Sequence, residues 1–314
     1  MKSTGSKSAQ PRRSNSRAVA AAASSRQSPP VTVSPRWILA ALGISLGTAV
    51  VCLWVALCFT FWLGNWQLLY HPKSSIAQTP AHVALTFDSI DFAAAESGQP
   101  QLHGWWIPSE GGSPFTAIVL HGADENIGDI TADLLPLHTA KLSLLAFDYR
   151  GYGRSRFERP SEQHWREDAE SAIVYLRDTR HIPAGSIILL GRGLGADLAL
   201  EVAAAHPELA GVVAEMPLEA PEDAVFHDPR ARLVPAHLLV RDRWNLLAAA
   251  TSLHVPTLWF ETDTRPPASE PEAYEKVGSR KVRVWLKAPI EKSSDYGSEL
   301  SRWLDELAPD KKVR

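Results

Sequence analysis

The stretch from Ile187 to Ala196 reads IILLGRGLGA, an apolar run that enters a turn with three glycines and continues into an alanine-rich segment. This pattern predicts a β-strand, a tight turn and an α-helix. Gly191 and Gly195 lack the Cβ atoms that would clash in so tight a turn, and Gly193 at its centre can adopt backbone angles that other residues disfavour. We therefore expect a strand-to-helix bend with a strained backbone at Gly193.

Composition and charge limit what kind of protein this is. The chain has 314 residues and two cysteines, Cys52 and Cys58, which lie in one apolar run, so neither a disulfide framework nor a cysteine-based metal site is available. Residues 1–36 contain seven Lys or Arg and no acidic residue, which leaves a net charge of −10 on the rest of a chain whose total is −3. An acidic globular part argues against nucleic acid as a partner.

The N-terminal segment, residues 1–36, is rich in Ser, Ala, Pro and Arg and has no apolar periodicity. Such a segment cannot bury enough surface to offset the entropy of ordering, so we predict a disordered basic tail. A plain cytoplasmic tail is the simpler interpretation, and a basic arm that binds lipid or a partner is the alternative.

Residues 37–63 form 27 consecutive positions without a charged side chain. A helix needs about 20 apolar residues to cross a bilayer core, and aromatic side chains suited to the two interfaces lie at both ends: Trp37, Trp62, Trp66 and Tyr70. The length disfavours a buried core helix, and the absence of a small-residue cleavage site disfavours a signal peptide. We predict a transmembrane helix over 37–63 and a juxtamembrane linker over 64–80.

Basic residues are distributed unevenly about this segment. Only Lys73 follows it closely, whereas five arginines precede it: Arg12, Arg13, Arg17, Arg26 and Arg36. The positive-inside rule then places the N-terminus in the cytoplasm and the globular domain in the periplasm or outside the cell.

From residue 81 onward, apolar runs alternate with helical patterns, which is typical of a sheet with crossover helices. A helix is expected behind a Ser161 cap, and another at the C-terminus with Leu300, Trp303, Leu304 and Leu307 on one face. We predict a domain over 81–308 and a C-terminal tail over 309–314. Its strands are expected at 83–92, 101–107, 115–120, 142–147, 187–190, 211–214, 257–260 and 282–286.

Three motifs occur in a fixed order: His121-Gly122 after one strand, DYRGYG at 148–153 after the next, and the glycine turn at 191–195. Together they resemble the α/β-hydrolase superfamily, and most closely its membrane-anchored Bem46-like and serine aminopeptidase-like group. That group tends to carry an apolar N-terminal anchor followed by a Leu-Tyr-x-Pro-like segment, matched by residues 69–72. The resemblance covers residues 66–308 and implies an α/β-hydrolase fold, with a mostly parallel sheet, helices on both faces and a short cap.

This resemblance also implies a degenerate catalytic triad. Relatives place their nucleophilic serine at the centre of the glycine turn, where this chain has Gly193. Their catalytic histidine follows the last strand, at the place of Ile290 and Glu291, but no histidine occurs beyond His254. His254 precedes the 257–260 strand, at its opposite end from the site.

The remaining catalytic positions are carried over by motif. Asp263 matches the acid of the triad best and Glu261 is a rival, although a solvated carboxylate at a strand end is the simpler interpretation of either. The backbone amides of Ala123 and Leu194 would form the oxyanion hole, which does not depend on side-chain identity. His121 is expected to support its loop rather than to move protons.

Two further features have alternative interpretations. Arg192, beside the turn, would bind an anion in the cleft or, more simply, lie on the surface. Residues 219–245 occupy the place of a cap, where His227 and Asp228 are read as a solvated face rather than as metal ligands. We predict no metal and no cofactor.

The sequence thus predicts a single-pass membrane protein whose outer domain is a pseudoenzyme. We expect it to act by binding a small-molecule ligand or a protein partner that the sequence does not identify, and to bind no nucleic acid. The alternatives are an active membrane-bound ester or amide hydrolase with a rearranged site, and a passive scaffold in a membrane complex.

Overall fold

The structure is a computed structural model that describes residues 34–93, 98–111, 114–218, 220–262, 272–287, 290 and 293–308. Two compact units are distinguished, one ending at Leu53 and one beginning at Trp54. The described part of the first unit is the beginning of helix α1 (Pro35–Gly64), so the helix predicted over 37–63 is confirmed. With the short helix η1 (Asn65–Leu68) it makes one segment long and apolar enough to cross a membrane. Of the predicted N-terminal tail, 1–36, residues 1–33 fall outside the described residues, while Pro35 and Arg36 already belong to α1; the predicted C-terminal tail, 309–314, lies outside them altogether.

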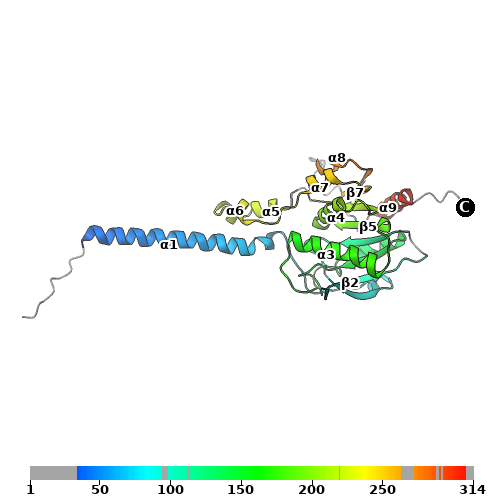
Figure 1. The fold of residues 1–314 in the computed structure, drawn as a ribbon, viewed down its shortest axis with the longest axis horizontal. Coiled ribbons are helices and arrows are strands. Elements are labelled where there is room, and N and C mark those ends of the chain that lie inside the picture. The colour runs from blue at the N-terminus through cyan, green and yellow to red at the C-terminus, as the bar shows by residue number, and fades with distance from the viewer. Residues whose placement is uncertain are drawn as a thin grey trace, which may run out of the picture. The chain divides into compact units, whose positions relative to one another are not determined.

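The second unit is built on a sheet of mostly parallel strands (Figure 1). Over the described residues, the sheet has eight strands in the order β1-β2-β4-β3-β5-β6-β7-β8. The β1–β2 and β2–β4 pairs are antiparallel and the other neighbours are parallel. The strands are β1 (Asp88–Ala93), β2 (Pro100–Ile107), β3 (Thr116–Leu120), β4 (Ser143–Phe147), β5 (Ile187–Arg192), β6 (Gly211–Glu215), β7 (Thr257–Thr262) and β8 (Lys281–Leu286).

All eight predicted strands are present, with one substantial difference in bounds. The first strand starts at Asp88 rather than at residue 83, because Pro80–Val83 forms a short 3-10 helix (η2). Proline at the first position of that turn has its φ preset for a helical conformation and has no amide hydrogen to contribute to a sheet.

Helices cover both faces of the sheet, and their buried side chains form two separate cores. One core involves α2 (Thr131–Thr139) and α9 (Ser294–Leu307). The other core involves α3 (Glu162–Val174), α4 (Leu194–Ala205), α7 (Leu246–Ser252) and α8 (Glu272–Lys276). The first four residues of β5, 187–190, alternate between the two cores, which explains why this part of the strand is an unbroken apolar run.

Two of the predicted helices are confirmed in detail. The Ser161 hydroxyl oxygen accepts a hydrogen bond from the backbone amide of His164 at 3.2 Å and so caps α3. In α9, Leu300, Trp303 and Leu304 are buried, while Leu307 is only partly covered.

The segment between β6 and β7 contains α5 (Asp223–Phe226), η5 (Pro229–Arg232) and α6 (Ala236–Leu239). It contacts the end of α1: Trp54 Nε1 donates to the Leu233 carbonyl oxygen at 2.9 Å, and Asn65 Nδ2 to the Leu239 carbonyl oxygen at 3.3 Å. Within the region 219–245 that was predicted to form a cap, we call residues 229–241 the cap segment.

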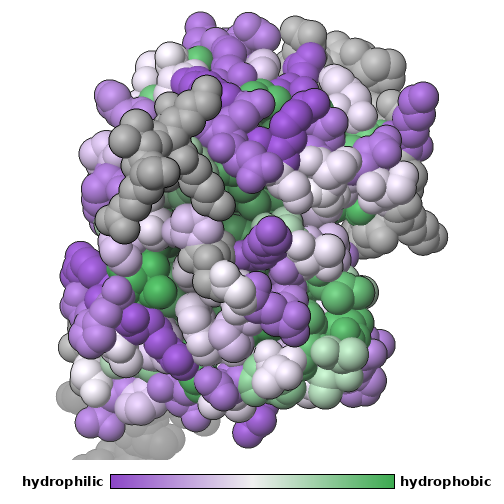
Figure 2. Space-filling model, turned by 90° about the vertical axis from the view of Figure 1, so that its right-hand side faces the viewer, coloured by the Kyte–Doolittle hydropathy of each residue, from purple (hydrophilic) through white to green (hydrophobic). Residues whose placement is uncertain are grey.

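Figure 2 shows the face of the molecule that lies to the right in Figure 1. Most of this face is hydrophilic, and its hydrophobic residues form scattered patches. Such a surface suits contact with water.

Candidate functional site

The glycine turn connects β5 to α4 with the geometry expected from the sequence. Gly193 has φ 55° and ψ −122°, a combination that residues with a Cβ rarely adopt. Its amide donates to the Glu215 carbonyl oxygen at 2.9 Å, which fixes the turn to the end of β6. A Cβ on Gly195 would lie 2.3 Å from the Leu120 carbonyl oxygen, so the turn also packs tightly against β3. The predicted strain at the centre of the turn is therefore present.

Among the described residues, nothing crowds the central position of the turn. A Cβ built on Gly193 would lie more than 4 Å from every atom of those residues apart from its chain neighbours. A side chain at this position would therefore meet no steric barrier from the described residues, and it would stand at the C-terminal edge of the sheet, the edge at which ligands bind in open α/β sheets. The backbone presents this position for a reactive side chain, and glycine supplies none.

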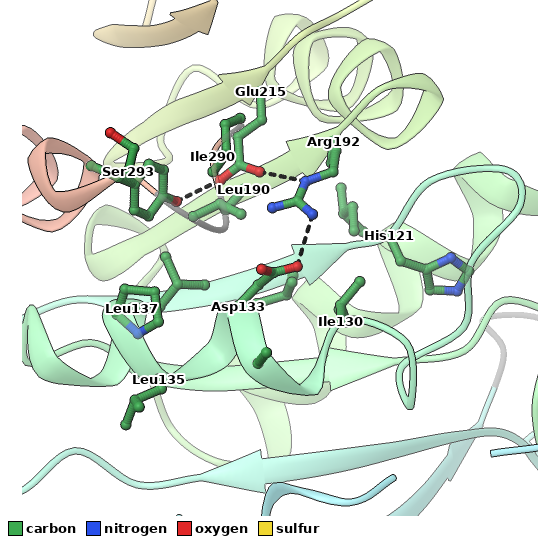
Figure 3. Close-up of a pocket in the computed structure, with 15 residues that line it drawn as sticks. His121, Ile130, Asp133, Leu135, Leu137, Leu190, Arg192, Glu215, Ile290 and Ser293 are labelled. Carbon is green, nitrogen blue, oxygen red and sulfur yellow. Dashed lines mark hydrogen bonds and ion pairs between the residues drawn. The ribbon is translucent and has the colours of Figure 1, made fainter. Parts of the chain in front are cut away.

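The side chain of Arg192, the last residue of β5, lies between two carboxylates (Figure 3). Its Nε donates to Glu215 Oε2 at 2.9 Å and its Nη1 to Asp133 Oδ2 at 2.8 Å. The Tyr296 hydroxyl of α9 donates to the second oxygen of Glu215. Burial opposes the charge of Arg192, but Glu215 and Asp133 outweigh this effect and raise its pKa.

The prediction that Arg192 lies on the surface is therefore wrong, because its side chain is only 13% exposed. Asp133 of α2 and Glu215 at the end of β6 hold the guanidinium inside the molecule. Two carboxylates already surround its single positive charge, so this arginine does not offer the free cation that an anion site needs.

A cavity of about 290 Å³ adjoins this network, between α2, α9 and the ends of β3 and β5 (Figure 3). Its polar end is formed by Arg192, Asp133 and Glu215. Its walls are mainly apolar and include Leu120, Ile130, Leu135, Leu137, Leu190 and Ile290. Sequence reasoning missed this cavity, because α2 was not predicted.

Residues 115–284 match the family model described as serine aminopeptidase, S33. The chain belongs to the serine aminopeptidase S33 family of α/β hydrolases. Among its relatives, the uncharacterized protein MT2364 of Mycobacterium tuberculosis is 31% identical over 215 residues, which are 67% of this chain and 73% of that protein. The uncharacterized protein YfhR of Salmonella typhimurium is 34% identical over 134 residues, which are 40% of this chain and 42% of YfhR.

Solved structures agree with the S33 family in fold. The Pyrococcus furiosus esterase Pf2001 superposes with a TM-score of 0.59 at 19% identity, over 76% of this chain and 97% of the esterase. A 2,6-dihydroxy-pseudo-oxynicotine hydrolase superposes with a TM-score of 0.57 at 19% identity, over 73% of this chain and 70% of that enzyme. The predicted α/β-hydrolase fold is thus confirmed, and at these identities the likeness concerns the fold alone.

Ile290, at the place where the resemblance predicts the catalytic histidine of relatives, is 4% exposed and lines the cavity, and its correspondence to that histidine stays a prediction. Glu291 lies outside the described residues. His254 stands before β7, and β5, β6 and β7 run parallel, so it lies at the opposite edge of the sheet from Gly193, as predicted.

The predicted acid, Asp263, also lies outside the described residues. Its rival Glu261 is fully buried within β7, so it is not a solvated carboxylate at a strand end.

The loop that follows β3 carries the first proposed oxyanion amide, that of Ala123. The Ala123 carbonyl oxygen accepts hydrogen bonds from the His71 amide at 2.9 Å and the Tyr152 hydroxyl at 2.7 Å, which hold the loop in place. Leu194, which carries the second proposed amide, is the first residue of α4 and directly follows the turn. An oxyanion hole at these two amides stays a prediction.

His121 is buried among aromatic side chains, with its ring centre 4.5 Å from that of Tyr149. Its Nδ1 lies 2.8 Å from the Gly122 carbonyl oxygen, and its Nε2 lies 3.7 Å from Asp148 Oδ1. Burial lowers the pKa of His121 to about 4 and raises that of Asp148 to about 7. A neutral, packed imidazole agrees with the predicted supporting role.

The two side chains considered as metal ligands have other partners. His227 Nδ1 lies 2.7 Å from the Asp223 carbonyl oxygen, and Asp228 pairs with Arg230 at 2.8 Å. Across the described residues, no group of three or more His, Cys, Asp or Glu side chains is arranged to hold a metal ion.

Proposed function

We propose that this member of the S33 family is anchored in a membrane by α1 and that its domain binds a ligand without hydrolysing it. The observation that carries the proposal is that two expected catalytic positions, those of Gly193 and Ile290, both lack a reactive side chain. Gly193 keeps the backbone angles of a nucleophile-presenting turn, and Ile290 stands where the catalytic histidine of relatives is expected.

The expected loss of catalytic rate is large enough to support this proposal. Removing members of a Ser-His-Asp triad costs about 10⁶ in turnover, while the oxyanion hole and substrate binding retain roughly 10³ to 10⁴ over water. At about 1.4 kcal/mol per decade, the loss amounts to about 8 kcal/mol of barrier. A weakened hydrolase would therefore differ from its active relatives by several orders of magnitude.

The cavity beside Arg192 is the proposed ligand site. Its walls are mainly apolar, and its polar end combines one guanidinium with two carboxylates that already pair with it. Such a site favours a small, mostly apolar and uncharged molecule with one hydrogen-bonding group, since an anion would face Asp133 and Glu215. The second kind of ligand that we propose for a hydrolase-like domain that lacks catalytic activity is a protein partner.

The membrane part of the proposal rests on α1 and on the charge asymmetry around it. The N-terminus would lie in the cytoplasm and the domain on the opposite side of the membrane. Addition of a protease to intact cells or spheroplasts tests this topology: the domain should be degraded without lysis. Protection of the domain until lysis would contradict it.

A second candidate function is ester or amide hydrolysis with a rearranged site. The S33 family membership and the esterase-like fold favour it.

A fluorophosphonate probe separates the two candidates. Wild-type protein in mild detergent should show no labelling, with an active serine hydrolase labelled in the same sample as the control. Labelling that disappears on denaturation would establish a reactive nucleophile and overturn the non-hydrolytic proposal.

A further inference from the structure

A second pocket, of about 210 Å³, lies at the end of α1. It is on the face of the sheet that α3 covers, opposite the face that carries the α2–α9 cavity. Trp62 of α1, Arg159 and Ser161 before α3, and Leu239 and Arg241 of the cap segment line it. Three segments far apart in the sequence thus converge where the chain leaves the apolar helix.

Two arginines in this pocket form no ion pair with a carboxylate among the described residues. The guanidinium of Arg159 lies over the Trp66 ring, 5.7 Å from its centre, and that of Arg241 over the Trp62 ring at 5.2 Å. Burial and the neighbouring Arg241 lower the pKa of Arg159, against the opposing effect of Asp242. The pocket therefore carries positive charge that its own side chains do not neutralise.

The acidic groups nearby do not remove this excess. Glu162 already accepts from Arg166 Nη2 at 2.7 Å and from the Arg243 backbone amide at 2.6 Å. Asp242 is the one carboxyl group among the described residues that line the pocket, and burial raises its pKa. One carboxyl against two guanidinium groups leaves room for an added anion.

The surroundings of the pocket resemble a membrane interface rather than a site in water. Tryptophan is favoured at the headgroup level, and about 20 helical residues suffice to cross the core, whereas α1 has 30. Its last turn, with Trp62, should therefore lie in the headgroup layer. On the cap segment, Leu233 and Leu238 are 62% and 83% exposed. Exposure of this apolar surface to water is unfavourable, whereas contact with lipid acyl chains would be favourable.

We propose that Arg159 and Arg241 bind the phosphate group of an anionic phospholipid, while Leu233 and Leu238 of the cap segment contact its acyl chains. This inference rests on the proposed membrane anchor. Two arginines can donate several charge-assisted hydrogen bonds to one phosphate, and the adjacent indole rings hold both guanidinium groups in place.

Native mass spectrometry of the full-length protein in detergent tests the inference, with phosphatidylglycerol and phosphatidylcholine of the same acyl chains as probes. Wild-type protein should retain phosphatidylglycerol in preference to phosphatidylcholine. The Arg159→Gln/Arg241→Gln variant should bind phosphatidylglycerol on the order of 30-fold more weakly, since each of the two arginines near an anionic headgroup contributes about 1 kcal/mol. A control variant, Arg177→Gln/Arg302→Gln, removes the same charge from exposed positions and should bind like wild type.

The outcomes distinguish binding of a phospholipid from binding of a soluble phosphate. They also distinguish failure of the lipid inference from failure of the membrane-anchor prediction. Equal retention of phosphatidylglycerol by wild type and by the Arg159→Gln/Arg241→Gln variant would overturn the inference. Displacement of phosphatidylglycerol by millimolar inorganic phosphate would also overturn it, because the ligand would then be a soluble phosphate. Carbonate extraction of membranes tests the anchor separately: both variants should stay in the pellet, and release of wild type would show that the anchor, rather than the arginine site, is wrong.

Discussion

A Cβ atom on Gly191 would lie 2.0 Å from the carbonyl oxygen of Gly195, so the two outer glycines of the turn close on each other. Gly193 between them has different surroundings, since a Cβ there would lie more than 4 Å from any atom of the residues that the structure describes, apart from its chain neighbours. The outer positions are thus restricted by contact and the central position only by its backbone angles.

This difference predicts a graded effect of alanine substitution on stability. Gly191→Ala should destabilise the protein by about 3 kcal/mol or more, because the backbone must move to relieve the clash. Gly193→Ala should cost about 1–3 kcal/mol, the strain of a positive φ alone. Thermal or urea unfolding of the full-length protein in detergent measures both.

A matched control for these variants is Gly278→Ala. A Cβ built on Gly278 would meet no atom of the described residues within 4 Å, and Gly278 has no positive φ, so its replacement should change stability by no more than about 0.5 kcal/mol. Equal losses of stability for Gly191→Ala and Gly193→Ala would show that the close approach of Gly191 and Gly195 does not limit which residues the turn tolerates.

The Arg192 network predicts a large loss when its single cation is removed. Arg192→Met leaves Asp133 and Glu215 buried beside the cavity without a counter-charge, which should cost about 3–5 kcal/mol. Tyr296→Phe removes one hydrogen bond to the Glu215 carboxylate, and the smaller expected cost is about 1.5–3 kcal/mol. Unfolding in urea measures both changes, and no measurable change is expected for the exposed Arg177→Met. A loss for Arg192→Met as small as that for Tyr296→Phe would contradict the buried ion pairs.

His206 gives the protein a pH-dependent contribution to stability. Its ring nitrogens lie 2.7 Å from Glu170 Oε2 and 2.8 Å from Glu208 Oε1. Burial opposes the charged ring, but Glu208 and Glu170 outweigh it and raise the pKa of His206 above its ordinary value. Because the folded pKa is raised, the contribution is complete below the unfolded value of about 6.5 and is lost as the pH rises through the folded value.

The His206→Gln variant tests this contribution. It should be less stable than wild type near pH 5.5, and the two unfolding curves should approach each other near pH 8.5. A difference that is constant over this range, or that grows toward alkaline pH, would show that the two carboxylates do not hold a charged ring.

Local and long-range features differed in how well the sequence predicted them. The glycine turn was predictable because its steric demands involve residues a few positions apart, and the strands were predictable because each is an apolar run. Arg192 was not, because its partner Asp133 lies 59 residues away on a helix that contains Pro136 and that the apolar pattern did not reveal. The contact between the Arg159 guanidinium and the Trp66 ring was not predictable either, because the two residues are far apart in the sequence and only the fold brings them together.

The last prediction concerns restoring a catalytic site. Gly193→Ser places a hydroxyl on the strained turn, at a position that no described residue crowds. A serine is a weak nucleophile until a base accepts its proton, and no histidine follows His254. Gly193→Ser alone should therefore remain silent toward fluorophosphonate probes and short-chain nitrophenyl esters. A second substitution that supplies the base, Ile290→His, is required before labelling appears, and Glu291→His is the other position to try. Gly193→Ala/Ile290→His is the control and should stay silent. Labelling of Gly193→Ser without the second substitution would show that another residue already serves as the base, and would favour the rearranged hydrolase.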